Sequence, residues 1–225
     1  MYPTPVQIIL QSNTCKDWTL EFAQHPSVQS KFKRCLDILG SLVGLLILAI
    51  AFVPIAITIK LDSPGAIFFS QERYGVYGRP FRIWKFRSMV NDAENLKSLV
   101  DNEANGLVFK NKNDFRITKV GRFLRSTSLD ELPQFWNVLM GDMSLVGTRP
   151  PTADEVAKYN NRHWQRLNVK PGLTGEWQVH GRSQVKDFEQ IVELDLRYQS
   201  NWHPLYDVHL IFKTIYVIVG RIGAF

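Results

Sequence analysis

An uncharged segment constrains this chain more than any other feature. Residues 38–59 contain no Asp, Glu, Lys or Arg. As a helix rising about 1.5 Å per residue, the segment would measure about 33 Å, which is enough to cross a hydrocarbon core of roughly 30 Å. It starts too late, is too long and lacks the small-residue cleavage site of a signal peptide. We therefore predict a membrane protein.

Pro54 lies within this segment, where a proline removes a backbone hydrogen bond and bends or splits a helix. Basic residues flank both ends, namely Lys31, Lys33 and Arg34 before the segment and Lys60 and Arg73 after it. Because basic flanks are retained on the cytoplasmic side, neither end favours crossing. The pattern favours a re-entrant helix over 31–60 that is broken or bent at Pro54. A plain kinked span stays open, because proline is tolerated in transmembrane helices.

The net charge of +6 suits an anionic membrane surface or a phosphorylated substrate. It would also suit nucleic acid, but the chain has no zinc-finger spacing or recognition-helix pattern, so no nucleic-acid partner is predicted. The 225 residues fit one catalytic domain with a membrane element. Cys15 and Cys35 provide no disulfide framework.

The segment SLDELPQFWNVLMGDMSLVGTRPP, residues 128–151, carries the chemistry. It places the adjacent acids Asp130 and Glu131 at the start of an amphipathic helix and an Arg149-Pro150 turn beyond it. Carboxylates can attack phosphorus or hold Mg²⁺, and a guanidinium binds phosphate oxygens through two parallel hydrogen bonds. The segment predicts a phosphate-handling enzyme with Asp130 and Glu131 as catalytic and metal-binding residues.

Apolar residues at three- and four-residue spacing from Leu132 to Met140 predict this helix, and Gly141 is expected to end it. A purely structural interpretation is a capping box formed by Ser128 and Glu131. That box would put Pro133 at the fifth helical position, where its missing N–H costs a hydrogen bond. We therefore expect the helix to be capped by Asp130, with the proline inside the first turn.

The remaining pattern predicts an α+β fold, mostly helical, with a short β-hairpin. Strands are expected over 66–73 and 81–86, with helices over 91–105, 152–167, 188–195 and 205–219. The last helix is too mixed to span a membrane and is expected to lie at the membrane surface or on the core. Residues 170–183 are expected to form a glycine-rich loop. The predicted organisation is a loosely ordered extension (1–30), the membrane helix (31–60) and a cytoplasmic catalytic domain (61–225).

Five basic residues are candidate phosphate or donor contacts: Lys85, Arg87, Arg125, Arg149 and Arg182. Arg149 and Arg182 lie on Gly/Pro-rich turns, where functional residues concentrate. Lys85 and Arg87 would equally suit a strand that faces lipid headgroups.

Other side chains are weaker candidates for the site. His163 and His180 have no Cys or His partner at ligand spacing, so no transition-metal site is expected. Trp136 and Trp177 are interpreted as core or interface aromatics rather than sugar-stacking platforms.

Three blocks of the sequence resemble the signature blocks of one family. They are KFRSM (85–89), LRSTSLDELPQFWNVLMGDMSLVGTRP (124–150) and VKPGLTGEWQVHGRS (169–183). Together they resemble the bacterial sugar transferases, the monotopic polyprenyl-phosphate hexose-1-phosphate transferases also called phosphoglycosyl transferases. The resemblance runs from about Lys31 to near the end of the chain.

The resemblance implies transfer of a sugar-1-phosphate from a UDP-sugar to polyprenyl (undecaprenyl) phosphate at the cytoplasmic face of the bacterial inner membrane. Such a step initiates a lipid-linked glycan for exopolysaccharide, capsule, O-antigen or glycoprotein synthesis. It also implies Mg²⁺, a covalent phosphosugar adduct on Asp130, and Glu131 as its partner in metal binding or proton handling. A homo-oligomer is possible in this family.

The sequence departs from the family pattern at two turns. The family breaks its re-entrant helix at a Ser-Pro pair, where this chain has Val53-Pro54, and its Pro-Arg-Pro turn is Thr148-Arg149-Pro150 here. Neither change removes a reacting group.

Two alternatives remain open from the sequence. One is a non-catalytic, membrane-tethered subunit of a glycan assembly complex. The other is a basic membrane-surface adaptor that binds by charge alone. The motifs do not fix the identity of the sugar.

Overall fold

The computed structural model describes residues 24–181 and 185–220. Helices dominate these residues: α2 (Pro26–Gln29), α3 (Lys31–Asp62), α4 (Lys119–Thr127), α5 (Gln134–Met140), α6 (Ala153–Val156), α7 (Asn161–Trp164), α8 (Glu176–Val179), α9 (Phe188–Ser200) and α10 (Pro204–Val219). Strand β1 (Phe68–Tyr74) pairs antiparallel with β2 (Pro80–Phe86), and β3 (Ser144–Val146) pairs parallel with β4 (Gly172–Thr174). The predicted α+β class, with its short hairpin, is confirmed.

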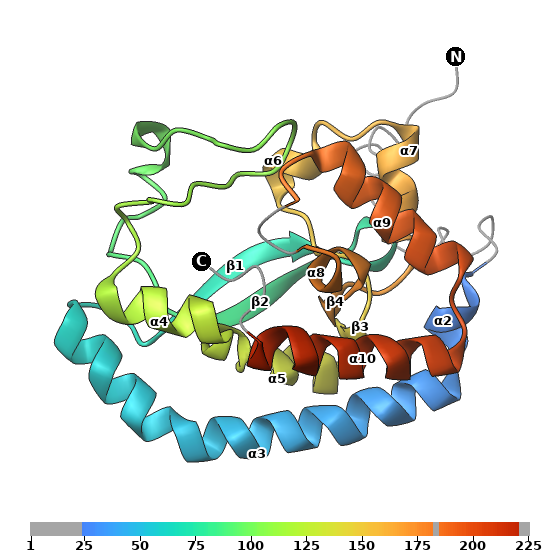
Figure 1. Cartoon of the computed structure of the whole chain (residues 1–225), viewed down its shortest axis with the longest axis horizontal. Coiled ribbons are helices and arrows are strands. Elements are labelled where there is room, and N and C mark those ends of the chain that lie inside the picture. Colours follow the sequence, from blue (N-terminus) through green and yellow to red (C-terminus); the bar gives the residue numbers. More distant parts are fainter. Residues whose placement is uncertain (1–23, 182–184, 221–225) are drawn as a thin grey trace, which may run out of the picture.

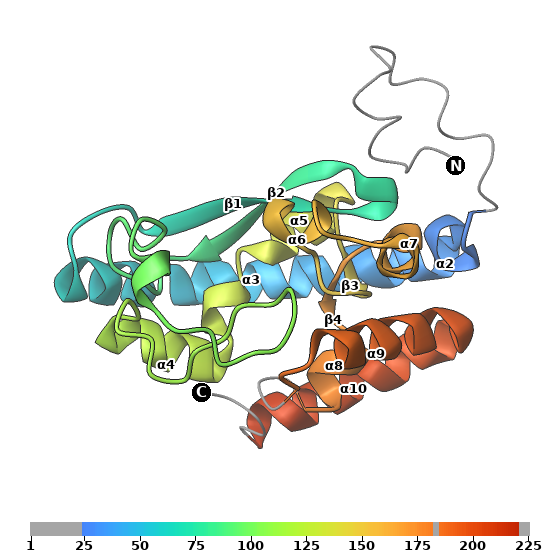
Figure 2. The same ribbon diagram turned by 90° about the horizontal axis from the view of Figure 1, so that it is seen from above.

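Helix α3 is a single bowed helix that runs along almost the whole length of the molecule (Figures 1 and 2). Among the described residues it is the one helix long and apolar enough to cross a membrane. The Ser30 hydroxyl caps its first turn by accepting from Lys33 N. Pro54 lies inside the continuous helix rather than between two helices. The Thr58 hydroxyl, one turn later, donates to the Pro54 carbonyl at 3.0 Å.

One face of α3 contacts the rest of the protein from end to end. The buried residues of this face are Lys33, Asp37, Ser41, Gly44, Ile55, Ala56 and Ile59. Between Gly44 and Ile55, partly buried apolar residues continue the face. At one end Lys33 forms an ion pair with Asp207 of α10 at 2.7 Å, and both groups are buried. At the other end a carboxylate oxygen of Asp62 accepts from the backbone N–H of Val120 in α4. Both ends of the helix are therefore fixed to the same domain.

The opposite face of α3 is apolar and exposed. Its residues are more than one third exposed: Phe32, Ile38, Leu39, Leu42, Val43, Leu46, Ile47, Ile50, Val53, Ile57 and Leu61. A contiguous exposed apolar face of this length is rare on a protein surrounded by water and marks a surface made for another apolar phase.

The second half of α3 supports the β-hairpin. Ile55 and Ile59 pack with Phe86 of β2, Leu124 of α4 and Leu132 in one buried cluster. The rings of Phe52, Phe68 and Phe86 stack with centroids 5.3–6.3 Å apart. The hairpin turn requires left-handed backbone at Tyr77 and Gly78, which the sequence YGVYGRP accommodates.

The short parallel pair β3–β4 was not predicted, because residues 170–183 were interpreted as a loop. It depends on glycines that let backbones meet: a Cβ on Gly147 would overlap the Lys170 carbonyl, and a Cβ on Gly172 would overlap the Gly147 backbone. Three-residue strands carry no detectable periodicity, so only a partner distant in sequence reveals them. Helix α8 follows directly after β4.

Two predicted helices are wrong or incomplete. Residues 91–105 form turns and a 3-10 segment (Lys97–Leu99) instead of a helix. The Asn102 side chain there bonds backbone groups of Ala104, Val108 and Lys110, which offers the chain an alternative to helical bonds. The helix predicted over 152–167 is divided into α6, α7 and a 3-10 segment, although Thr152 caps it as expected.

The two C-terminal helices complete the core. The helix predicted over 188–195 is confirmed as α9, which buries Ile191, Val192 and Tyr198. The helix predicted over 205–219 is confirmed as α10, which buries Leu210 and Val217 but exposes Phe212, Ile215, Tyr216 and Val219. Its position at a membrane surface stays a prediction.

The contact between α3 and α5 gives a first test. A Cβ on Gly44 would overlap the ring of Phe135. We expect Gly44→Leu to lower the free energy of unfolding by roughly 1–3 kcal/mol, because the overpacked side chain must push the helices apart. Thermal unfolding of the full chain in detergent measures this effect. Ala49→Leu, on the exposed face of the same helix, is the control and should leave the melting temperature nearly unchanged. Equal effects of the two substitutions would contradict the assigned contact.

Candidate active site

The acidic pair lies on a 3-10 turn (Leu129–Glu131) between α4 and α5. Ser128 adopts left-handed backbone and ends α4, so it does not cap the following helix. Helix α5 starts after Pro133, which occupies the N-cap position without a side-chain bond, and ends at Gly141 as predicted. Both sequence interpretations of the cap, the box through Ser128 and the cap by Asp130, are therefore wrong. Left-handed backbone at a serine is uncommon, and no residue pattern indicated it here.

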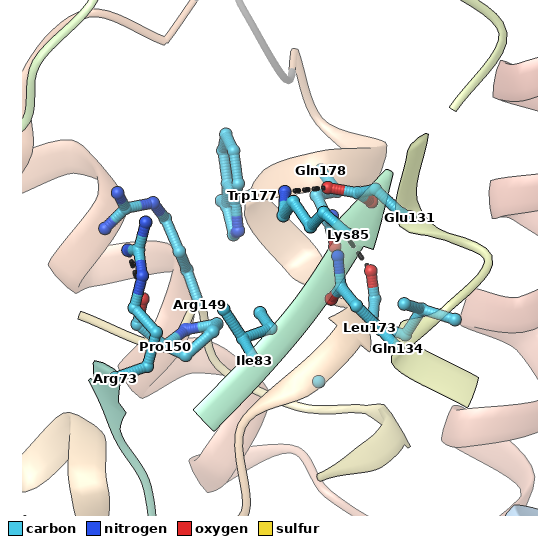
Figure 3. Close-up of a pocket in the computed structure, with 11 residues that line it drawn as sticks. Arg73, Ile83, Lys85, Glu131, Gln134, Arg149, Pro150, Leu173, Trp177 and Gln178 are labelled. Carbon is cyan, nitrogen blue, oxygen red and sulfur yellow. Dashed lines mark hydrogen bonds and ion pairs between the residues drawn. The ribbon is translucent and has the colours of Figure 1, made fainter. Parts of the chain in front are cut away.

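An open cavity of about 190 Å³ lies beside this turn. Figure 3 shows its two ends: the Lys85–Glu131 pair on one side, the neighbouring guanidinium groups of Arg73 and Arg149 on the other, and the Trp177 indole between them. The lining residues come from the hairpin, the acidic turn and the segments around β3 and β4: Arg73, Ile83, Lys85, Glu131, Gln134, Arg149, Pro150, Gly172, Leu173, Trp177 and Gln178. The cavity thus joins the three sequence blocks.

At the acidic end, Lys85 of β2 donates to a carboxylate oxygen of Glu131 at 2.8 Å. Both side chains are about one quarter exposed, so the pair faces the cavity. Asp130, the neighbouring residue, is 6% exposed. The two carboxylates therefore differ in their access to water, because Asp130 is buried whereas Glu131 reaches the cavity.

Arg125, on the last turn of α4, brings a second cation to the acidic pair. Its Nε donates to the Ser88 hydroxyl at 2.9 Å. Burial lowers the pKa of Arg125, and the carboxylates of Asp130 and Asp114 oppose that effect. Arg125 is therefore close enough to Asp130 to interact with it electrostatically. It does not line the cavity, and its role as a phosphate or donor contact stays a prediction.

At the opposite end, Arg149 forms a bidentate pair with Glu155 of α6 at 2.7 and 3.1 Å. Arg166 supports the turn that carries Arg149, because its guanidinium donates to the Arg149 carbonyl at 3.3 Å. Arg166 is itself buried in an ion pair with Asp195 at 2.7 Å. The guanidinium of Arg149 is thereby fixed in orientation before any ligand arrives.

Arg73 is a site residue that the sequence interpretation missed, since it was noted only as a membrane flank. Its Nη1 donates to the Pro150 carbonyl at 3.0 Å and its Nη2 to Gln71 at 2.7 Å, while its buried Nε has no partner. Burial first, and then the charge of Arg149, lowers the pKa of Arg73 to about 10. Arg73 and Arg149 thus bring two like charges, only one of them paired with a carboxylate among the described residues, to the same end of the cavity, where an anion would be favoured.

Trp177 and Lys110 extend this cationic end. The Lys110 ammonium lies 5.3 Å from the centroid of the Trp177 ring. Burial, followed by the charges of Arg149 and Lys186, lowers the pKa of Lys110 to about 8. Trp177 lines the cavity and also packs against the core cluster around Phe188, so its interpretation as a core aromatic describes only one of its faces.

Gln134 is a second residue that sequence reasoning missed. Its side chain is 3% exposed and lines the cavity beside Glu131, and its Nε2 has no hydrogen-bond partner. An unsatisfied buried amide donor costs free energy unless a ligand accepts from it.

The structure separates Arg87 from the other candidates. Its guanidinium donates to the carbonyls of Pro64, Ser63 and Ile59 and thus closes the C-terminal end of α3. Arg87 does not line the cavity. Arg182 lies outside the described residues. Trp136 is half exposed and does not line the cavity.

The histidines have other partners. His163 bonds Glu189 at 2.7 Å, and His180 bonds Glu176 at 2.6 Å. In residues 24–181 and 185–220, no three His, Cys, Asp or Glu side chains form a group that could hold a metal ion. Mg²⁺ needs less, because it takes one or two protein carboxylates and completes its shell with water and substrate phosphates. The consecutive carboxylates Asp130 and Glu131 fit that requirement.

Comparison with known proteins gives a family match. The family model described as bacterial sugar transferase matches residues 28–221. The chain is 52% identical over 194 residues to the galactosyl transferase CpsE of Streptococcus agalactiae, covering 85% of this chain and 43% of that protein. It is 44% identical over 199 residues to the undecaprenyl-phosphate galactose phosphotransferase of Salmonella typhimurium, covering 86% of this chain and 41% of that one.

A third relative acts on another sugar by its name. The chain is 40% identical over 196 residues to the UDP-glucose:undecaprenyl-phosphate glucose-1-phosphate transferase of Escherichia coli, covering 84% of this chain and 40% of that protein. The chain therefore spans about two fifths of the length of these curated relatives.

The lowered pKa of Lys110 predicts a pH step in anion binding. UMP is a suitable probe, because a phosphate monoester stays dianionic well above its second pKa near 6. Lys110 is charged below about pH 8 and loses its proton as the pH rises, so the cationic end weakens. We expect the dissociation constant of UMP to increase between pH 7 and pH 9.5. A bound anion raises the pKa of the lysine, which places the step above pH 8.

Lys110→Gln should remove this step, with weaker binding at pH 7. The control is Lys119→Gln, which removes an exposed lysine of α4 and should retain the step. A pH step of equal size in the Lys110 variant would contradict the assignment. Isothermal titration calorimetry measures all three proteins.

Proposed function

The chain belongs to the bacterial sugar transferase family, and from that premise we propose that it transfers a sugar-1-phosphate from a UDP-sugar to polyprenyl phosphate, the first step of a lipid-linked glycan. One observation carries the proposal. The Lys85–Glu131 pair lines one end of a cavity whose other end holds the cations Arg73 and Arg149, and the buried carboxylate of Asp130 directly precedes Glu131 on the same turn. Such a cavity can grip a diphosphate between an attacking group and a leaving-group site.

In the first step, a carboxylate oxygen of Asp130 attacks the phosphorus that bears the sugar. The new O–P bond forms as the bond from that phosphorus to the bridging oxygen breaks, and UMP leaves with the bridging oxygen and its electron pair. The product on the protein is an acyl phosphate that links Asp130 to the sugar-1-phosphate. No proton transfer is needed, because the charge lost by the carboxylate appears on UMP.

In the second step, a phosphate oxygen of polyprenyl phosphate attacks the same phosphorus and expels the Asp130 carboxylate. The products are the polyprenyl diphosphate sugar and free enzyme. Dividing the transfer lets a water-soluble donor and a lipid acceptor use one site in turn.

The side chains around the acid pair have complementary roles in this scheme. Arg73 and Arg149 neutralise the charge that develops on the departing UMP, because both line the far end of the cavity. Arg125 steadies the buried Asp130 electrostatically. Gln134 offers its free amide donor to a phosphate or sugar oxygen beside Glu131.

Mg²⁺ is the proposed cofactor, held by Asp130 and Glu131. When bound, it neutralises the charge of the diphosphate and so assists the departure of UMP. Glu131 would then be held between Lys85 and the cofactor site, which assigns it to metal binding rather than to attack.

We also propose that α3 is re-entrant. Both of its ends bond the same domain, through the Lys33–Asp207 pair and through Asp62 to the Val120 N–H. Because both ends of α3 are bonded to the same domain, they cannot lie on opposite sides of a bilayer. Its exposed apolar face would then enter one leaflet, while the domain stays at the cytoplasmic face of the bacterial inner membrane.

The adduct gives the direct test of function. With Mg²⁺ and a UDP-sugar labelled in the β-phosphate, but without polyprenyl phosphate, we expect UMP in amounts comparable to enzyme and label on Asp130. The Asp130→Asn variant should carry no label, and its rate of turnover should fall by about 10³-fold or more, because an amide is a poor nucleophile. Peptide mapping by mass spectrometry locates the label.

Asp142→Asn is the matched control, since Asp142 is an exposed acid near the end of α5 and should keep both signals. Release of UMP only when the acceptor is present, without any adduct, would mean direct transfer and would leave Asp130 as a metal ligand. Absence of all metal-dependent turnover across a panel of UDP-sugars would favour the non-catalytic subunit.

The membrane arrangement is tested separately by labelling. In a chain with Cys15→Ser and Cys35→Ser, we introduce Lys31→Cys or Lys60→Cys, which flank the apolar segment. Neither position should react with an impermeant maleimide added to intact spheroplasts, and both should react after permeabilisation. Reaction of one position from outside would mean that α3 crosses the bilayer.

A further inference from the structure

A second cavity, of about 240 Å³, lies where the chain enters α3. It is lined by residues of α2, of the first turns of α3 and of the segment just before β4. These residues are Ser27, Val28, Gln29, Ser30, Lys31, Lys33, Arg34, Asp37 and Lys170. None of these residues lines the cavity at the acidic pair. Four of them are cationic and one is a carboxylate.

The charges around this cavity are unequally matched. Lys33 is neutralised by Asp207 at 2.7 Å. Asp37 accepts from the Ser144 hydroxyl and the Leu145 N–H, both at 2.8 Å, so its carboxylate is turned toward β3. Arg34 donates to the last carbonyls of α5, at Val138 and Leu139.

Lys170 feels the carboxylates of Asp37 and Asp142 but bonds neither of them. Among the described residues its ammonium has no hydrogen-bond or ion-pair partner. It lies beside Gly141, where a Cβ would stand 3.6 Å from the Lys170 ammonium and 3.7 Å from the Arg34 guanidinium. Burial, and next the charge of Arg34, lowers the pKa of Lys170. Half-buried ammonium and guanidinium groups thus face one cavity without an anion between them.

We infer that this cavity binds a phosphate group, supplied by an anionic phospholipid headgroup at the membrane surface. Lys170 and Lys31 would contact the phosphate, and the N-terminal end of α3, a 32-residue helix, adds positive potential on the same side. The neighbouring α3 residues Phe32 and Leu39 are more than half exposed and apolar, which places acyl chains next to the headgroup. This site is independent of the proposed transfer reaction.

The test measures the melting temperature of the full chain in a neutral detergent as short-chain lipids are added. Dihexanoyl phosphatidylglycerol should raise the melting temperature in a saturable way, because a ligand that binds only the folded state stabilises it. Dihexanoyl phosphatidylcholine, whose phosphate is neutralised by choline, should raise it much less. Lys170→Gln and Lys31→Gln should each weaken the apparent affinity for phosphatidylglycerol by about fivefold or more, the effect of losing one charge-assisted contact.

Two controls separate this site from the rest of the protein. Lys158→Gln removes an exposed lysine elsewhere and should keep the wild-type response. Arg73→Gln removes a cation from the cavity at the acidic pair and should also keep the wild-type response to phosphatidylglycerol. A response lost in Arg73→Gln but kept in the Lys170 and Lys31 variants would place the anion in the other cavity and overturn the inference.

Inorganic phosphate at matched ionic strength distinguishes the source of the anion. A saturable stabilisation equal to that of phosphatidylglycerol, and dependent on Lys170, would assign the site to soluble phosphate and overturn the lipid source. No Lys170-dependent response to either anion would overturn the site itself. Because Lys31 is exposed, its variant keeps the test decisive if Lys170→Gln folds poorly.

Discussion

The attachment of α3 to the rest of the protein is the constraint on which the other features depend. Helix α3 is mostly apolar, yet its first turns carry a buried ammonium and a buried carboxylate that are matched by Asp207, Ser144 and Leu145. Removing either partner would leave an uncompensated buried charge, which is costly in a low-dielectric interior. The helix and the domain therefore form one folding unit, and the acidic turn, which packs on that unit through Leu132, inherits its position from it.

The cavity at the acidic pair is organised by opposed charges whose surroundings differ. The acids are placed by a 3-10 turn and by a lysine from the hairpin, whereas the arginines are held by carbonyls and carboxylates on a separate support that ends in the buried Arg166–Asp195 pair. Preorganised charges of this kind favour a diphosphate because they need not be rearranged when it binds. The buried, unpartnered nitrogens of Arg73 and Gln134 belong to two residues that line this cavity, where a bound anion could accept from them.

Much of this arrangement could be predicted from the sequence, and the failures have physical causes. The apolar run, the hairpin, α9 and α10 follow from local periodicity, which reports burial directly. The cap of α5 was missed because Ser128 adopts a left-handed conformation that its residue type does not announce. Arg73 was missed because its neighbours in sequence are membrane flanks, whereas its contact with Pro150 joins positions 77 residues apart. Arg87 was overestimated for the converse reason: its motif neighbour Lys85 faces the cavity, but its own partners are carbonyls at the end of α3.

The hydrogen bonds from Arg87 to the carbonyls of Ser63 and Ile59 limit how α3 can be replaced. The carbonyl of Ile59 near the end of α3 and the carbonyl of Ser63 just after it accept hydrogen bonds from Arg87, which lies two residues after Lys85. A generic apolar helix of equal length would keep backbone carbonyls but would lose the Ile55 and Ile59 side chains, which pack with Phe86 of β2 beside Arg87. Helix α3 is thus not an interchangeable module. Chimeras between relatives should exchange the helix together with the hairpin, because Phe86 and Arg87 contact the last turns of the helix and the residues that follow it.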